Sequence, residues 1–275
     1  MGALAKPARG GKLQDMGAID TAAGRIGVAE NGTRGGVPIL FLHGVGSDKS
    51  VWQPQLDHYR GVRPAIAIDY PGYGDSTLQP GATRDDYARA AFAVLDALGH
   101  DAAHVCGLSL GGVVAIAMHA LEPERCRSLI LADTFIAHPD GRAIYDRSLA
   151  GSANMRQLAE NRISVLLGPN PDLAMRAHLL ETMAGIDPAA YRLGAEAVWL
   201  ADQRDRVAAI DVPALALCGA HDVVTPPALS EELAAAIAGA KLAIINGAGH
   251  LVNIERPADF NAAVDRFLSK VEENS

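Results

Sequence analysis

One five-residue turn, Gly-Leu-Ser-Leu-Gly at residues 107–111, constrains this 275-residue chain more than any other stretch. An apolar run at 102–106 precedes it and a helical pattern at 113–121 follows it, so the turn is predicted to join a buried strand to a helix. Glycines two positions before and after the serine remove side chains that would clash in such a sharp turn. The pattern predicts that Ser109 is an exposed nucleophile and that the backbone N–H of Leu110 faces a developing oxyanion.

The same five residues also fit a plainer interpretation, in which a glycine-rich turn carries an incidental serine. The rest of the chain favours the first interpretation, because short apolar runs alternate with helical patterns along most of its length. A hairpin is expected over residues 18–31. The later runs are expected to be buried strands, and they cover residues 38–42, 65–68, 126–132, 213–218 and 241–245. This alternation predicts an α/β fold with a mostly parallel central sheet flanked by helices.

The alternation of strands and helices stops between residues 134 and 198. Arginines and leucines are interleaved there without a strand pattern, and Gly-Pro-Asn-Pro at 168–171 interrupts them. We expect several short amphipathic helices that form an inserted lid (cap) over the site, although an ordinary run of surface helices gives the same pattern. Residues 16–133 and 199–275 are then the core, and residues 1–15 are expected to be a flexible tail.

A glycine-containing loop, His-Gly-Val-Gly-Ser at residues 43–47, follows the first predicted buried strand. Ligands of open α/β sheets bind at the carboxyl ends of the strands, where glycines let the backbone approach closely. The N–H of Val45 is therefore predicted to be a second oxyanion donor, while an ordinary glycine turn is the alternative. His43 is expected to be structural, and Asp69 and Asp75 are expected to brace a later loop.

Two more loops at the ends of predicted strands supply an acid and a base. Asp222 follows one strand, and His250 follows the next within Gly-Ala-Gly-His. The chain order Ser, Asp, His is the one that this architecture uses for a catalytic triad. Ser109 is predicted to be the nucleophile, His250 the base and Asp222 the orienting acid. Asp133, at the end of another strand, is the alternative acid.

Composition limits the classes of protein that the chain can belong to. A hydrophobic content of 49% with 20% charged residues is typical of a globular protein, and a net charge of -8 without a basic run argues against nucleic-acid binding. The three cysteines lie in apolar runs without metal-ligand spacing, so buried thiols in a reducing compartment are expected. No metal or organic cofactor is predicted. Without a signal-peptide pattern or a membrane-spanning run, a cytoplasmic protein is expected.

Together these stretches resemble the α/β-hydrolase superfamily over nearly the whole chain. The matching residues are 43–46, 69–76, 107–112, 219–222, 225–227 and 249–250. Within the superfamily, residues 107–112, 225–227 and 249–257 are similar to the 3-oxoadipate enol-lactonase-like group, and carboxylesterases share most of these pieces. At residues 43–48 that group often has Asn-Ser-Leu-Gly-Thr-Asp, whereas this chain has His-Gly-Val-Gly-Ser-Asp.

The resemblance implies a serine hydrolase of the EC 3.1.1 type, which cleaves a small-molecule ester or enol-lactone through an acyl-enzyme. A serine at the elbow argues against haloalkane dehalogenases and epoxide hydrolases of this fold, because those enzymes place an aspartate there. Two alternatives stay open: a C–C bond hydrolase acting on a meta-cleavage type product, and a non-catalytic ligand receptor. The sequence does not choose between a monomer and a homodimer, and it does not name the natural substrate.

Overall fold

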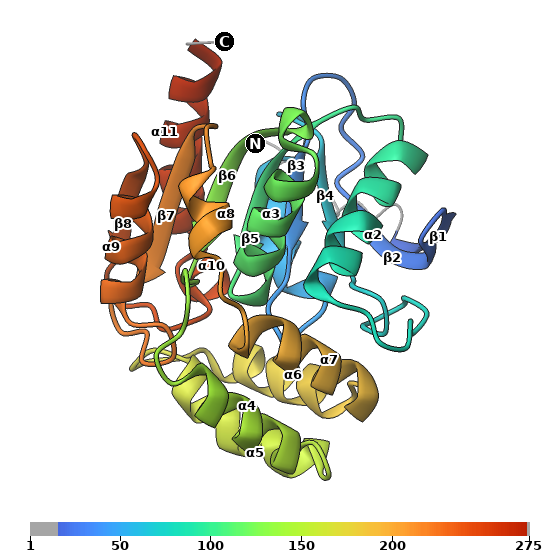
Figure 1. The fold of residues 1–275 in the computed structure, drawn as a ribbon, viewed down its shortest axis with the longest axis vertical. Helices are drawn as coiled ribbons and strands as arrows, with labels where there is room; N and C mark the ends of the chain where they lie inside the picture. The colour runs from blue at the N-terminus through green and yellow to red at the C-terminus, as the bar shows by residue number, and fades with distance from the viewer. Residues whose placement is uncertain (1–15, 274–275) are drawn as a thin grey trace, which may run out of the picture.

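An eight-stranded sheet in the order β1-β2-β4-β3-β5-β6-β7-β8 forms the centre of the protein (Figure 1). The computed structural model describes residues 16–273, so the predicted tail at 1–15 lies outside the described residues. The strands are β1 (Met16–Thr21), β2 (Gly24–Glu30), β3 (Ile39–Leu42), β4 (Ala65–Ile68), β5 (Ala103–Leu108), β6 (Cys126–Ala132), β7 (Ala214–Gly219) and β8 (Lys241–Ile245). Strands β3 to β8 are parallel and the β1–β2 hairpin is antiparallel, which confirms the predicted α/β architecture.

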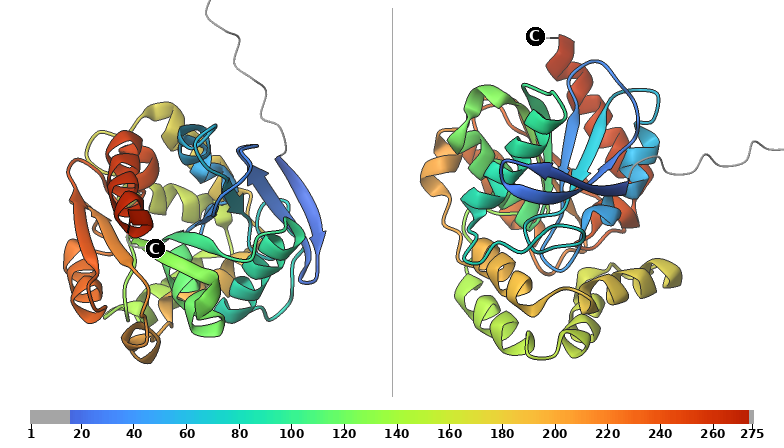
Figure 2. Two further views of the ribbon diagram at one scale, coloured as in Figure 1. Left: turned by 90° about the horizontal axis from the view of Figure 1, so that it is seen from above. Right: turned by 90° about the vertical axis from the view of Figure 1, so that its right-hand side faces the viewer.

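Helices cover both faces of this sheet (Figure 2). One layer consists of α2 (Arg84–Ala97), α3 (Leu110–Leu121), α8 (Arg204–Ala208) and α9 (Pro227–Ala236), which contact one another in that order. The other layer consists of α1 (Gln53–His58), α10 (Val252–Glu255) and α11 (Pro257–Glu273). Short 3-10 turns, η1 (Lys49–Trp52) and η2 (Pro123–Arg125), precede α1 and β6.

Side chains of the buried strands alternate between two hydrophobic clusters, one under each helical layer. Leu40 and Leu42 of β3 belong to the cluster beneath α2 and α3, whereas Ile39 and Phe41 belong to the cluster beneath α1 and α11. Every residue of β3 is buried, so both faces of the strand are apolar. This burial on both faces explains why the sequence of such a strand is a continuous apolar run.

The turn between β5 and α3 holds Ser109 in a strained backbone conformation, with φ 56° and ψ -113°. A Cβ at Gly107 would overlap the carbonyl group of Gly111, and a Cβ at Gly111 would overlap the carbonyl oxygen of Leu42. Both glycines are thus required by close backbone contacts. The prediction that they remove clashing side chains is confirmed.

Five helices lie between β6 and β7, and the first four of them run beneath the carboxyl ends of the parallel strands (Figure 1). They are α4 (Gly141–Gly151), α5 (Met155–Leu166), α6 (Leu173–Ala184) and α7 (Pro188–Trp199). All of residues 134–198 are described, and none of them belongs to a strand of the sheet. An isolated bridge between Ala137 and Asp202 joins the two ends of this insertion.

The three cysteines are buried free thiols, as predicted. Burial raises the pKa of the Cys126 thiol to about 12 and that of Cys106 well above its usual value, so neither is a reactive thiolate. No helix within residues 16–273 combines the length and apolar character needed to cross a bilayer.

Gly107→Ala tests the close packing at the turn. Because the new methyl group would overlap backbone atoms of Gly111, we expect the free energy of unfolding to fall by about 3 kcal/mol in chemical denaturation. Gly17→Ala is the control, since nothing lies within 4 Å of its added Cβ, and it should change stability by less than about 0.5 kcal/mol. Equal effects of the two substitutions would contradict this account.

Candidate active site

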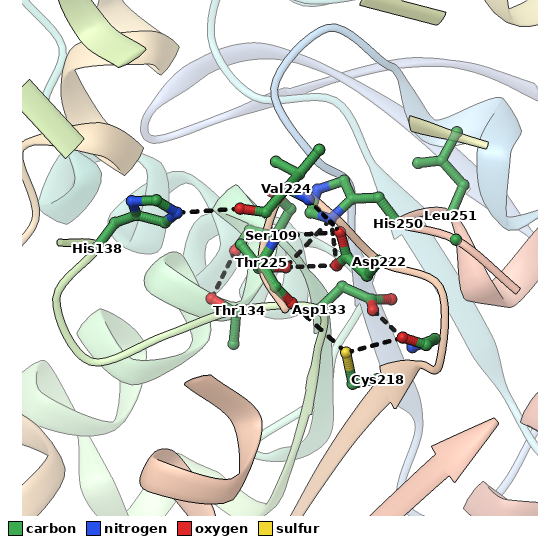
Figure 3. A network of polar contacts seen from close by, with 12 residues as sticks. Ser109, Asp133, Thr134, His138, Cys218, Asp222, Val224, Thr225, His250 and Leu251 are labelled. Carbon is green, nitrogen blue, oxygen red and sulfur yellow. Dashed lines mark hydrogen bonds and ion pairs between the residues drawn. The ribbon is translucent and has the colours of Figure 1, made fainter. Parts of the chain in front are cut away.

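Asp222 and His250 are joined by a hydrogen bond of 2.8 Å between Oδ2 and Nδ1 (Figure 3). Asp222 lies in the loop after β7 and His250 in the loop after β8, and both side chains are buried. The bond occupies Nδ1 of the imidazole, so Nε2 is the nitrogen left to face a reacting group. The structure thus brings together the predicted base and the predicted acid.

The Asp222 carboxylate accepts several further hydrogen bonds from its own loop. Oδ1 accepts from the backbone N–H groups of Val224 (2.7 Å) and Thr225 (3.0 Å), and Oδ2 accepts from the Thr225 hydroxyl (2.6 Å). Burial by itself raises the pKa of this carboxyl group, but the charge and hydrogen bonds of His250 and Thr225 outweigh burial and lower it below its usual value. Asp222 is therefore ionised at neutral pH. Sequence reasoning missed the role of Thr225, although the residue lies in one of the stretches that resemble the superfamily.

Ser109 and His250 line one small cavity of about 20 Å³. The Ser109 side chain is buried, and its Oγ has no hydrogen-bond partner among the described residues, so it is not bonded to His250 in this structure. Figure 3 shows Ser109, which follows β5, beside the Asp222–His250 pair from the loops after β7 and β8. A hydroxyl group beside a free imidazole nitrogen in an enclosed site is the arrangement of a nucleophile and its base.

Both predicted oxyanion donors lie close to Ser109. A Cβ at Gly44 would be 3.4 Å from the Ser109 Cβ, and the next residue, Val45, lines the same cavity. Leu110 is the first residue of α3, where backbone N–H groups have no partner within the helix. Within residues 16–273, neither N–H group has a hydrogen-bond acceptor, so both are available to a ligand.

Apolar side chains from α5 and α6 close the cavity. Ile163 and Leu166 come from α5, and Leu179 and Met183 come from α6. Met183 also packs onto the Val45 loop, since a Cβ at Gly46 would be 2.8 Å from its Cε. The cavity beside Ser109 is therefore small and lined on this side by apolar side chains.

Glu255 of α10 links these helices to the loop that carries His250. Its Oε2 accepts the N–H of Gly168 after α5 (2.6 Å), and its Oε1 accepts the N–H groups of Gly249 (2.9 Å) and Leu251 (3.3 Å). The N–H of His250 itself donates to the carbonyl of Leu166 (2.8 Å). The end of α5 is therefore fixed to the histidine loop. The sequence contained Glu255 in its family-like stretch but gave no sign of this role.

The loops around the site are braced by a buried lysine. Lys49 Nζ lies 2.7 Å from Asp69 and 2.6 Å from Asp75, and its backbone N–H also donates to Asp69. These contacts join the loop after β3 to the loop after β4. His43 is buried and contacts Tyr70, which agrees with its predicted structural role.

Asp133, the alternative acid predicted from the sequence, also lies close to Asp222 and His250. One ligand atom from each of Asp133, Asp222 and His250 lies within 4.8 Å of the others, which makes them a possible metal-binding group. The oxygens of Asp222 and Nδ1 of His250 are, however, already engaged with each other and with the loop containing Thr225. The arrangement is that of a hydrogen-bonded acid–base pair with a second carboxyl group behind it.

This strand order, the serine elbow and the acid–base pair are those of one family. Residues 39–263 match the alpha/beta hydrolase family model, and the chain belongs to that family. It is similar to 3-oxoadipate enol-lactonase 1 of Acinetobacter baylyi, with 26% identity over 90% of this chain and 94% of the relative.

Solved structures give the same fold. The crystal structure of the enol-lactonase from Burkholderia xenovorans matches with a TM-score of 0.84 and 26% identity, over 92% of this chain and 99% of the other. A thermophilic esterase from Thermogutta terrifontis matches with a TM-score of 0.83 and 27% identity, over 92% of this chain and 98% of the other. Two of the similar proteins are therefore lactonases and one is an esterase.

Glu255→Ala tests the link between the histidine loop and α5. It leaves three N–H groups without their acceptor, so we expect the free energy of unfolding to fall by about 2 kcal/mol and ester turnover to decrease as His250 loses its support. Glu231→Ala, at an exposed position of α9, is the matched control and should change neither quantity. If Glu255→Ala behaves like the control, the link has no role in holding the loop.

Proposed function

We propose that this protein is a serine hydrolase that cleaves a small carboxylic ester or an enol-lactone through an acyl-enzyme. The observation that carries the proposal is the convergence of Ser109 with the hydrogen-bonded Asp222–His250 pair at one cavity. The similarity to two enol-lactonases and an esterase supports the substrate class.

In the first half-reaction, Ser109 Oγ attacks the carbonyl carbon while His250 Nε2 accepts the hydroxyl proton. The oxyanion formed from the carbonyl is stabilised by the N–H groups of Val45 and Leu110. Asp222 keeps the Nδ1–H of His250 oriented and stabilises the imidazolium. The tetrahedral intermediate then expels the alkoxide or enolate, which takes the proton from His250, and the acyl group remains on Ser109.

In the second half-reaction, water replaces the alcohol. His250 removes a proton from water, and the hydroxide attacks the acyl-enzyme carbonyl to give a second oxyanion in the same place. Collapse of this intermediate breaks the bond to Ser109 Oγ, which regains its proton from His250, and the carboxylic acid leaves. With a lactone, both product groups belong to one molecule. None of these steps requires a group beyond the residues named.

The four-helix insertion acts in this proposal as the lid predicted from the sequence. Leu179 and Met183 of α6 cover Ser109, so opening of α6 admits the substrate and closing excludes bulk water. The apolar character of this cover favours an uncharged reacting group next to Ser109. The substrate partner is thus a small molecule whose ester or lactone carbonyl enters beneath α6.

Ser109→Ala should lower ester turnover by about 10⁴-fold or more while the thermal unfolding temperature stays near that of the wild type. The physical reason is loss of the atom that forms the acyl-enzyme. Ser164→Ala, on an exposed position of α5, is the control and should retain full turnover. The wild type should also label stoichiometrically with a fluorophosphonate and turn over p-nitrophenyl esters steadily. Labelling without turnover would instead identify a receptor.

The choice between ester and lactone needs a direct comparison at neutral pH. We expect 3-oxoadipate enol-lactone, generated in place, to exceed p-nitrophenyl acetate and butyrate by about a hundredfold in kcat/KM if it resembles the natural substrate, which corresponds to ~2.7 kcal/mol of transition-state binding. A larger kcat/KM for the simple esters would assign the protein to carboxylesterases.

A further inference from the structure

A groove with a volume of about 930 Å³ lies at the amino ends of the parallel strands. It is formed by the opening residues of β6, β7 and β8 and by the part of α11 from Ala263 onward. Ser109, Asp222 and His250 follow the carboxyl ends of their strands, so the length of the sheet, roughly 20 Å for the six residues of β7, separates them from the groove. In Figure 1 the end of α11 and the helices α4 to α7 lie at opposite ends of the molecule. A ligand of this groove is therefore separate from the group that reacts at Ser109.

The floor of the groove is apolar. Ala263, Phe267 and Val271 recur every four residues along α11, so they lie on one face of that helix. They belong to the hydrophobic cluster beneath α11, as does Leu215 of β7, which also lines the groove. Leu242 of β8 lines the groove as well but is 43% exposed. A bound hydrocarbon chain would remove this leucine from water, which is favourable.

The rim of the groove is positively charged. Arg127 of β6, Lys241 of β8 and Arg266 of α11 are exposed, and none of these side chains forms an ion pair or a hydrogen bond within residues 16–273. Lys270, one turn after Arg266, adds a fourth cation. This local excess of positive charge occurs in a protein whose net charge is -8. The groove therefore attracts anions, whereas the molecule as a whole repels them.

The two remaining ionisable groups of the lining do not cancel this charge. Glu272 Oε1 lies 2.7 Å from Arg63 Nη1, so its negative charge is already paired. His104 is buried, and burial lowers the pKa of its imidazole to about 4, so this ring is neutral at neutral pH. Its Nδ1 lies 2.8 Å from the Ser128 hydroxyl. The cations of the rim are thus left for a ligand.

We propose that this groove binds a long-chain carboxylate, with the hydrocarbon chain on the α11 floor and the carboxylate at the cationic rim. An apolar floor beside unpaired cations matches a molecule that is apolar over most of its length and carries one negative group. Arg127 and Arg266 suit a carboxylate because a guanidinium group can donate two parallel hydrogen bonds to it. Nucleic acid fits poorly, since its phosphates need a longer basic surface and gain nothing from an apolar floor. The binding does not involve Ser109, so the proposal does not depend on the proposed function.

The first measurement is the dependence of Kd on chain length. Butanoate, octanoate and dodecanoate are titrated into the full-length protein by calorimetry, at concentrations at which none of them forms micelles. A fully buried methylene group lowers Kd about fourfold, so octanoate should bind at least about tenfold more tightly than butanoate even in a groove that is open on one side. Dodecanoate should bind more tightly still. Equal Kd values for the three carboxylates would show an ion site that does not use the floor, and would overturn the proposal.

The second measurement locates the ligand. Replacing both Arg127 and Arg266 by Gln removes two charges of the rim but keeps long polar side chains, and the Kd of dodecanoate should rise at least about tenfold. Arg25→Gln is the matched control, because Arg25 is an exposed residue of β2, close to the opposite edge of the sheet from β8. It should leave Kd unchanged. All three arginines are exposed, so the variants should fold like the wild type, which thermal unfolding checks. An unchanged Kd in the double variant would place the ligand elsewhere and overturn the proposal.

A third measurement separates a free carboxylate from a lipid surface. The protein is sedimented with vesicles of phosphatidylcholine alone and of phosphatidylcholine with phosphatidylglycerol. Binding to the anionic vesicles without binding of monomeric dodecanoate would assign the rim to a membrane surface and refute the proposed ligand. Ester turnover of the Arg127 and Arg266 double variant should equal that of the wild type, because the groove is remote from Ser109. A wild type without ester turnover would refute the proposed function but not the groove, so the two failures are distinguishable.

Discussion

The arrangement of this site depends on a close backbone contact between α3 and the centre of the sheet. Gly111 lies against the carbonyl oxygen of Leu42, and Gly107 lies against the carbonyl group of Gly111, with no room for a Cβ at either position. This packing, with hydrogen bonds from the Ser109 N–H to Ala132 and from Thr134 Oγ1 to the Ser109 carbonyl, holds Ser109 at a positive φ. The strain is maintained because the surrounding core over-determines the turn.

The other loops of the site are held around Ser109 by polar contacts that join one loop to another. Lys49 joins the loops after β3 and β4 through Asp69 and Asp75, and Glu255 joins the histidine loop to the end of α5. Buried ion pairs contribute little net stability, because desolvation offsets attraction, but breaking them leaves an unpaired charge. Their effect here is to fix which loops meet at Ser109.

Local signals predicted most of the elements because each has a local physical cause. Thr83 and Asp86 form a capping box at the start of α2, and α3 begins at Leu110 as expected from the elbow. The contacts of Glu255 and Thr225 were not predicted, since their partners are distant in sequence or depend on how a loop turns. The sequence also did not predict that Asp133 lies close to Asp222, although both were candidates for the acid.

The sequence alone determined the sheet-and-helix alternation, the strained elbow and the order of serine, aspartate and histidine, because strand periodicity and glycine requirements are properties of neighbouring residues. Tertiary structure decided which acid bonds His250, since Asp133 and Asp222 both lie in loops that follow strands, and it is Asp222 that accepts hydrogen bonds from the loop containing Thr225 and from His250. It also decided how the site is covered: Leu179 and Met183 are ordinary helical apolar residues in sequence, and only the packing of α6 over Ser109 makes them the cover.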